Sequence, residues 1–443
     1  MVLDRLVALI AVIVLVSSCA RRQQVPQLIA SNIVNVKIAE GTQTVGPCEP
    51  SICINPANPN QILAGSILDR VHISNDGGRS WTNTTLKSSV GVYGDPVVRI
   101  DTKGNMYFAH LSNPSGLAYI ADDFLDRIQV QKSTDGGKTW TDGSAPANDR
   151  MKDQDKQWLY IDPVTDHVLM SWTEFDKYGD KTAVDCSRIL FSKSIDRGDS
   201  WTDPIAISDI EGDCVDDDYT TEGAVPAMDK DGNIYVTWAH GANIYLDKSS
   251  DGGKTWLAKD RVVTDLFGGW ALDIPGISRC NGMPVLGIDR SEGPHSGNLY
   301  VNWSDQKNGP DDTDIWLTRS TDGGKTWTDR IRVNDDDSGK HQFFSWMDVD
   351  PVTGYIYIVF YDRRAYADNN TDVYLAYSTD GGTSFINQKI STEPFEPQSS
   401  VFFGDYNDIS AHGGMVRPIW TRLDGATLSV WTALVEHKTT ATK

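Results

Sequence analysis

Charged residues recur near the start of segments that otherwise alternate apolar and polar positions. When seven such segments are aligned by their shared final residue, four of them carry a charge at one equivalent position: Glu49, Asp95, Lys156 and Asp405. Asp155 and Glu222 stand one position earlier. A buried strand end that served only packing would be apolar. Crowded carboxylates raise one another's pKa, so such a cluster can supply an acid together with a base or nucleophile.

The elements that must position these residues are hairpins. Alternating strands joined by turns of the Asp-Gly-Asn kind recur seven times, beginning near Glu49, Asp95, Asp155, Glu222, Asn281, His341 and Gly404. Each hairpin is followed by a third strand, a recurring turn and a fourth strand. Four antiparallel strands in a repeat of roughly 60 residues is the pattern of a β-propeller blade. We therefore predict one all-β, seven-bladed propeller domain over residues 32–443, with six blades as the alternative if the last unit is a cap.

The last repeat lacks a fourth strand of its own. Its third strand, TLSVWTALVE, runs close to the final residue, whereas residues 32–39, NIVNVKIA, alternate in the way a strand requires. We expect this early segment to complete the last blade and close the ring, which removes exposed sheet edges.

The turn between the third and fourth strands repeats a motif that we call the Asp box. STDGGKTW stands unchanged at residues 133–140 and 320–327, and variants stand at 74–81, 194–201, 249–256 and 378–385. Its glycines allow positive φ, its Asp can accept hydrogen bonds from its own turn, and its Trp can fill the gap between blades. One Asp supplies too few oxygen ligands for calcium. We interpret the box as a structural turn on the face opposite to the charged strand starts.

A second group of polar and aromatic residues is expected near the charged strand starts. It comprises Trp158, His240, His341, Arg363, Arg364 and Tyr406, with His110, Asp362 and Trp346 beside them. One interpretation is a water-filled channel mouth, where charges stay solvated and pair with one another, Asp95 or Glu49 with Arg363 for instance. The other is an active site on the axis, because ligand pockets occupy such mouths.

The first residues predict export. An apolar run at 6–16 has the length of a signal-peptide core and is short for a membrane span. It ends in Val-Ser-Ser-Cys, which resembles the lipobox of bacterial lipoproteins. We predict a signal peptide at 1–18, lipidation of Cys19, a linker at 19–31, and an exported protein anchored by lipid in the outer membrane, periplasm or cell surface; a simple signal peptide is the alternative.

The amino-acid composition limits the classes of binding partner and cofactor that we expect. A formal charge of −21 argues against nucleic acid, which requires a concentrated basic face. No Cys or His spacing suggests zinc, and we expect no cofactor; the acidic runs 216–218 and 335–337 could hold Ca²⁺, although solvated loop charge is the favoured interpretation. Five cysteines remain after Cys19, and Cys186 with Cys214 is the favoured pair. We expect a monomer.

Six Asp boxes in a signal-bearing propeller resemble the Asp-box, or BNR-repeat, sialidase-like superfamily. The resemblance covers nearly all of residues 32–436, and EPSICINPANPNQILAGS, YGDPVVRID and FFGDYNDISAHGG are similar to bacterial secreted proteins of sialidase-like type. It implies glycan hydrolysis by a Tyr nucleophile backed by a Glu, an Asp acid/base and three arginines that hold the substrate carboxylate. These roles would fall on Tyr406, Glu222 and Asp95, with the clamp on Arg363 and Arg364.

The sequence departs from that family in two ways. The family's early Phe-Arg-Ile-Pro phrase is absent, and true sialidases have six blades. Two hypotheses therefore stay open. The first is a glycoside hydrolase, exo-α-sialidase-like, with Glu222, Tyr406, Asp95 and Asp155 as catalytic residues. Its substrate would be held by Glu49, Lys156, Trp158, His240, His341, Arg363, Arg364 and Asp405. The second is a non-catalytic propeller that binds glycan or protein at the cell envelope; a lyase using His341, Tyr406 and Arg363 is a further alternative.

Overall fold

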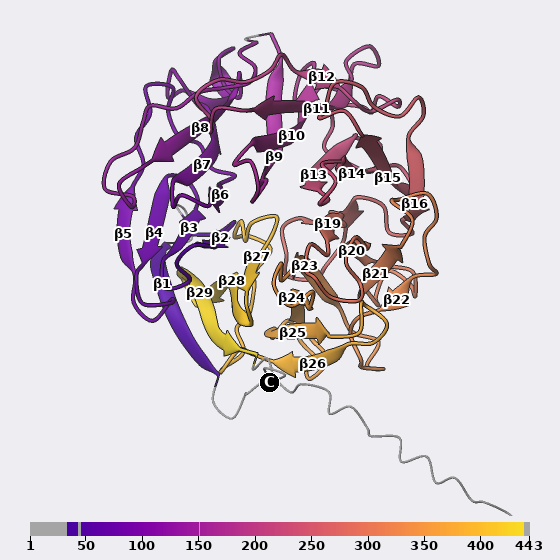
Figure 1. The fold of residues 1–443 in the computed structure, drawn as a ribbon. Coiled ribbons are helices and arrows are strands. Elements are labelled where there is room, and N and C mark those ends of the chain that lie inside the picture. The colour runs from indigo at the N-terminus through magenta and orange to yellow at the C-terminus, as the bar shows by residue number, and fades with distance from the viewer. Residues whose placement is uncertain (1–32, 43–45, 150, 438–443) are drawn as a thin grey trace, which may run out of the picture.

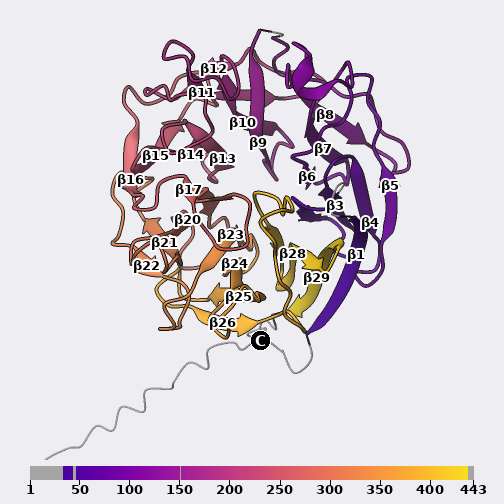
Figure 2. The same cartoon turned by 180° about the vertical axis from the view of Figure 1, so that it is seen from behind.

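A computed structural model describes residues 33–42, 46–149 and 151–437, and these form seven sheets arranged round a common axis (Figure 1). The same ring is seen from behind in Figure 2. The strands of blades one to three, from the axis outward, are β2 (Ser51–Ile54), β3 (Ile62–Ser66), β4 (Arg70–Ser74) and β5 (Thr82–Thr85); β6 (Val97–Ile100), β7 (Met106–Leu111) and β8 (Ile128–Ser133); and β9 (Asp153–Ile161), β10 (Val168–Phe175), β11 (Ser187–Ser194) and β12 (Ile205–Ala206).

Blades four to six follow the same order. Their strands are β13 (Glu222–Met228), β14 (Ile234–His240), β15 (Asn243–Ser249) and β16 (Arg261–Asp265); β19 (Val285–Ile288), β20 (Leu299–Asp305), β21 (Asp314–Ser320) and β22 (Ile331–Arg332); and β23 (Gln342–Val349), β24 (Ile356–Asp362), β25 (Asp372–Ser378) and β26 (Ile386–Lys389). A small hairpin, β17 (Ala271–Leu272) with β18 (Cys280–Asn281), precedes blade five, and a short 3-10 helix, η1 (Ala118–Ile120), lies in blade two.

The seventh blade joins the two ends of the chain. Its own strands are β27 (Asp408–His412), β28 (Met415–Asp424) and β29 (Thr427–Glu436), and β1 (Val34–Thr42) pairs antiparallel with β29 from Val34↔Leu434 to Thr42↔Thr427. In Figure 1 the indigo β1 accordingly lies beside the yellow β29. The predicted closure and the count of seven blades are confirmed, and the six-bladed alternative is wrong.

Blade two differs from its neighbours at its outer edge. It has three strands, and a single bridge from Val130 to Ser144 stands where the fourth strand is expected. The segment beside that bridge contains Gly143 and Pro146, both of which disfavour a continuous strand.

The Asp boxes form the turns between third and fourth strands, as predicted. In the box at 133–140, the Thr139 backbone N–H donates to Asp135 Oδ1 at 2.9 Å, and the Thr139 hydroxyl donates to Oδ2 at 2.6 Å. The second glycine contacts the preceding blade: a Cβ on Gly137, which has φ +83°, would lie 2.0 Å from Ile73 Cδ1. The box therefore closes its own turn and sets the spacing between blades.

The predicted signal peptide, Cys19 and linker lie outside the described residues. Within the described ranges, no helix is long and apolar enough to cross a membrane. Cys186 and Cys214, the favoured disulfide, are both free thiols in this part of the chain. The pairing is wrong because Cys186 Sγ points to the Val184 carbonyl, 3.8 Å away, whereas Cys214 is buried beside the backbone of Asp176 and Lys177.

Candidate functional site

The innermost strands begin on one face of the ring with an unusual backbone. Glu49, Asp95, Lys156 and Phe344 all have φ between 47° and 51°, and Gly223 has φ 77°. Each stands six residues before the turn that ends its strand. The predicted equivalence of Glu49, Asp95 and Lys156 is thus visible in the backbone, while in blade seven the positive φ falls on Gly404, next to Asp405. Left-handed non-glycine residues are held at a cost of about 1–3 kcal/mol each, and they concentrate at functional sites.

Lys156 is the centre of the charges on this face. Its Nζ lies 2.6 Å from Asp405 Oδ2 and 3.4 Å from Asp95 Oδ2, and only 4% of its side chain is exposed. Burial alone would lower the pKa of Lys156, but Asp405, Asp95 and Asp155 raise it well above the usual value. Lys156 is therefore a permanent cation that holds carboxylates from blades two and seven at the axis.

Arg279 is the second cation of the site. Its Nε donates to Asp405 Oδ1 at 2.7 Å, its Nη2 pairs with Asp405 Oδ2, and its Nη1 lies 3.1 Å from Asp216 Oδ2. Asp216 also accepts a hydrogen bond from the Tyr178 hydroxyl at 2.7 Å. With 45% of its side chain exposed, Arg279 is the charged group that an approaching ligand meets first.

We call the set of these charged groups the axial cluster; it comprises Glu49, Asp95, Asp155, Lys156, Asp216, Glu222, Arg279 and Asp405. Its carboxyl groups divide into two kinds. Burial acts to raise the pKa of Asp405 and Asp216, but Lys156 and Arg279 overcome this and hold both below the usual range. These two acids are ionised.

The pKa values of three other acids of the cluster, Asp155, Glu222 and Glu49, are shifted upward. Burial, together with Asp95 and Asp216, raises the pKa of Asp155 to about 7 despite Lys156. Burial followed by Asp216 raises the pKa of Glu222, and burial followed by Asp95 raises that of Glu49. The buried Glu222 shares a side-chain hydrogen bond with the ionised Asp216, which also favours the protonated form of Glu222. One site thus holds protonated and ionised carboxyl groups together, which is the arrangement acid–base catalysis requires.

Three aromatic side chains, the aromatic floor, lie directly below the axial cluster. The ring centroids of Trp158 and Trp346 are 4.1 Å apart, and Tyr406 meets Trp158 edge-on at 5.4 Å. The Tyr406 hydroxyl donates to the Pro96 carbonyl at 3.4 Å. Trp158 and Tyr406 are therefore brought to the site as predicted, and the floor forms the base of the axial cluster.

Tyr406 and Glu222 do not have the neighbours that the resemblance implies. Charges of Asp95, Glu49, Lys156 and Asp405 act on Tyr406, whose pKa is raised mainly by burial. Those acting on Glu222 are Asp216, Lys156 and Asp155. The carboxyl groups beside the tyrosine are therefore Asp95, Glu49 and Asp405.

Arg363 and Arg364 lie away from the axial cluster. Arg363 donates to the Pro275 carbonyl at 2.6 Å and to Thr371 Oγ1 at 3.0 Å, and it covers the ring of Phe343. Arg364 pairs with Asp362, Asp335 and Asp336. Both follow the second strand β24, which lies one strand spacing, about 4.8 Å, further from the axis than the innermost strands. Across the described residues, neither arginine forms a hydrogen bond or ion pair with the cluster, and the predicted pairing of Asp95 or Glu49 with Arg363 is wrong.

The two histidines also lie outside the cluster. His240 Nδ1 is 3.1 Å from the Thr221 hydroxyl, and His341 Nδ1 is 3.0 Å from the Thr313 hydroxyl. Burial lowers the pKa of both imidazoles, so they are neutral at pH 7. They border the site as residues that fix loops.

Sequence reasoning missed Arg279, Asp216 and Tyr178 as members of the site. Arg279 belongs to the irregular segment between β17 and β18, where no repeat marks a position. Asp216 stood in an acidic run considered for calcium, but it pairs with Arg279, while Asp218 accepts the Ala271 backbone N–H at 3.0 Å. In the second run, Asp337 pairs with Arg332 at 2.8 Å. The described residues contain no group of three metal-binding side chains.

Comparisons with known proteins find sequence similarity over part of the chain. No protein-family model matches the chain. A sialidase from Bacteroides fragilis (strain YCH46) is 28% identical over 155 residues, which are 29% of this chain and 27% of that protein. The chain thus aligns with about a quarter of the length of this curated relative. The expected resemblance to sialidase-like proteins is confirmed over that stretch.

Solved structures of low identity also match, each with a TM-score below 0.5. The leech intramolecular trans-sialidase matches with a TM-score of 0.49 and 13% identity, over 77% of this chain and 67% of that one. A sialidase from Streptococcus pneumoniae matches at 0.49 and 9%, over 84% and 83%. A protein of unknown function from Dyadobacter fermentans DSM 18053 matches at 0.48 and 13%, over 91% and 99%.

Proposed function

We propose that this sialidase-like β-propeller is a glycoside hydrolase with its active site at the axial cluster. The observation that carries the proposal is the divided protonation of the carboxyl groups. Asp155, with a pKa of about 7, is placed to donate a proton to the leaving oxygen. Asp95, the most open carboxylate beside Tyr406, with 13% of its side chain exposed, acts as base or nucleophile, directly or through the Tyr406 hydroxyl.

The two cations of the axial cluster limit the class of substrate that the site can hold. A sialic-acid carboxylate is best held by several guanidinium forks. The only arginine paired with the cluster acids among the described residues is Arg279, whose Nε and Nη2 already bind Asp405 and whose Nη1 binds Asp216. The ionised Asp405 and Asp216 also already pair with Lys156 and Arg279, so neither cation of the cluster is free to hold a strongly anionic sugar. We therefore propose an uncharged terminal sugar as the first choice of substrate, with a sialoside as the alternative.

A panel of fluorogenic glycosides tests the proposal. The purified domain is assayed with neutral hexosides, N-acetylhexosaminides and a sialoside, together with Asp95→Asn and with Asp231→Asn, an exposed aspartate on a hairpin turn of the opposite face, as the control. Turnover of at least one glycoside by the protein and by the control, but lost in Asp95→Asn, is the expected result. Equal turnover in all three proteins would place any activity elsewhere.

The second candidate function is a non-catalytic glycan- or protein-binding propeller at the cell envelope. It is favoured by the closed state of the cluster, because Lys156, Asp405 and Glu222 are each at most 5% exposed. A glycan array read beside the hydrolysis panel separates the two functions. Binding on the array without turnover of any glycoside would support the binder and overturn the hydrolase.

We further propose that the protein is exported and held in the envelope by a lipid on Cys19. The apolar run and lipobox-like residues support this. Replacement Cys19→Ala is expected to abolish incorporation of labelled palmitate by the producing cells and to move the protein from the membrane fraction to the aqueous fraction. Cys186→Ala, which removes a thiol of the folded domain, is the control and should leave labelling unchanged. Labelling that persists in Cys19→Ala would overturn the anchor.

A further inference from the structure

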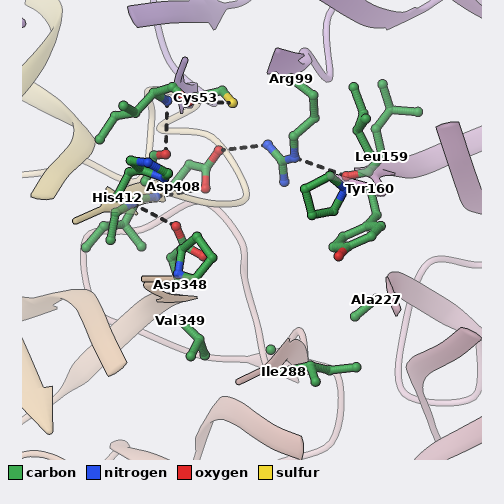
Figure 3. A pocket seen from close by; sticks show the side chains of 18 of the residues that line it. Cys53, Arg99, Leu159, Tyr160, Ala227, Ile288, Asp348, Val349, Asp408 and His412 are labelled. Carbon is green, nitrogen blue, oxygen red and sulfur yellow. Dashed lines mark hydrogen bonds and ion pairs between the residues drawn. The ribbon is translucent and has the colours of Figure 1, made fainter. Parts of the chain in front are cut away.

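A second cavity occupies the other end of the central channel, on the Asp-box face. Its volume is about 240 Å³, and the final residues of all seven innermost strands line it (Figure 3). Trp158 and Trp346 of the aromatic floor form its inner end, so the floor separates it from the axial cluster. Pro56, Pro163 and Pro351, partly or fully exposed, surround its mouth, so the cavity opens to solvent.

Most of the wall is apolar. Figure 3 shows Val349, Ile288 and Ala227 on the side opposite to Arg99 and Asp408. This apolar side of the cavity favours contact with an apolar body of matching size. A dry cavity of about 150 Å³ holds benzene in another protein, so this one has room for a single ring with a short polar substituent.

Arg99 supplies a charge that the protein leaves incompletely compensated. Its Nε donates to the Leu159 carbonyl at 3.1 Å and its Nη1 to the Val98 carbonyl at 2.8 Å, which fix the guanidinium over the Trp158 ring. The nearest carboxylate, Asp408, is 3.8 Å away, beyond hydrogen-bond distance. In the described structure, Nη2 of Arg99 donates no hydrogen bond to a protein acceptor, and 21% of the side chain is exposed.

The acids of the cavity attract Arg99 but accept no hydrogen bond from it in the described structure. Asp408 accepts hydrogen bonds from Ser51, Ile52 and Ile409, and burial raises its pKa. Asp348 accepts from the Ala411 backbone N–H through Oδ2, which leaves Oδ1 toward the cavity, and burial raises its pKa to about 7. Arg290, the other cation of the lining, already pairs with Asp162 and two backbone carbonyls. Arg99 is thus the cation of this cavity that has capacity for a ligand.

We propose that the cavity at the Asp-box end of the channel binds a small carboxylate with an apolar, single-ring or short-chain body. The carboxylate accepts from Arg99 Nη2, the protonated Asp348 donates to it through Oδ1, and the apolar body packs on the wall of Val349, Ile288 and Ala227. This site is independent of the glycan chemistry proposed for the opposite face.

Three isosteric probes test the site by calorimetry at pH 6, where Asp348 is protonated and phenylacetate is an anion: phenylacetate, phenylacetamide and phenethylamine. Phenylacetate is expected to bind about ten-fold or more tightly than the other two, because a charge-assisted hydrogen bond exceeds a neutral one by that amount. Arg99→Met should weaken phenylacetate by about ten- to a hundred-fold. Ala227→Phe, which fills the cavity and leaves Arg99 in place, should abolish binding of all three.

Asp95→Asn, on the far side of the aromatic floor, is the matched control and should leave the affinity for phenylacetate unchanged. Each remaining result counts against the proposal. Equal affinities for the three probes, a preference for phenethylamine, absence of binding, binding that survives Ala227→Phe, or weakening by Asp95→Asn would each overturn it. Thermal melts of every variant show that the folded fraction is the same in each titration.

Discussion

Replacement of Asp155 by asparagine is expected to lower turnover of the best glycoside by about 10²–10⁴-fold. The reason is that asparagine cannot donate a proton to the leaving oxygen, which is the step we assign to the protonated Asp155. Because Asp155 is already neutral below pH about 7, the uncharged isostere preserves the packing at this buried position. The kcat should fall while KM changes little, since the substrate contacts remain.

The pH dependence gives a second readout. The acid must be protonated, so kcat/KM of the protein should fall as pH rises through about 7, and Asp155→Asn should lack this limb. Stability moves in the same direction: the folded pKa lies above the unfolded value of about 3.9, so the folded state binds more protons between about pH 4 and 7 and loses stability as pH rises. Asp155→Asn should lose less stability over that range.

Asp231→Asn serves again as the control for both measurements. A variant Asp155→Asn that keeps the alkaline limb and full turnover would show that another group is the acid, and Glu222 or Glu49, whose pKa values are also raised, would be the next to replace. Urea unfolding of the variants at pH 5 and pH 8 reports the stability difference directly.

The fold was predictable because local chemistry repeats. Each Asp box fixes a turn through its own hydrogen bonds, so six copies mark six junctions between third and fourth strands without any tertiary information. The alternation of residues 32–39 was enough to foresee that β1 completes the last blade. The absence of a regular fourth strand in blade two was not predicted, because Gly143 and Pro146 interrupt that one strand without changing the sequence repeat.

Residues of the site could be predicted only where they occupy an equivalent position in several repeats. Glu49, Asp95 and Lys156 share a backbone position and were found by alignment. Arg279 was not, because an irregular segment brings it across the mouth of the channel to Asp405, 126 residues away in sequence. Arg363 and Arg364 were misplaced for a related reason: alignment gives the face on which a strand ends, but the distance from the axis depends on the position of that strand in its blade.

Replacement of Lys156 by methionine is expected to destabilise the protein by about 3–5 kcal/mol at pH 7, because it leaves the buried Asp405 and its neighbour Asp95 without their shared cation. Methionine retains the length and apolar stem of the lysine, so the loss of stability measures the effect of removing the charge. Arg279 still pairs with Asp405, but its guanidinium is partly exposed and does not replace Lys156 at Asp95.

Lowering the pH should reduce the difference in unfolding free energy between the protein and Lys156→Met. In the protein, Asp405 has a folded pKa below its unfolded value of about 3.9, so its contribution is present above that value and is lost as pH falls through the lower folded pKa. In Lys156→Met the folded pKa of Asp405 rises, so protonation relieves the unpaired charge. Urea unfolding should therefore show the largest deficit at pH 7 and a smaller one near pH 4.

Two comparisons make the result specific to the buried pair. Lys132→Met removes a cation that pairs with the exposed Asp199, and such surface pairs contribute at most about 1 kcal/mol. The double variant Lys156→Met/Asp405→Asn should recover part of the loss, because it removes the unpaired carboxylate along with the cation. A deficit in Lys156→Met no larger than that of Lys132→Met, and independent of pH, would show that Lys156 does not hold the axial carboxylates together; a deficit that the double variant relieves would show that it does.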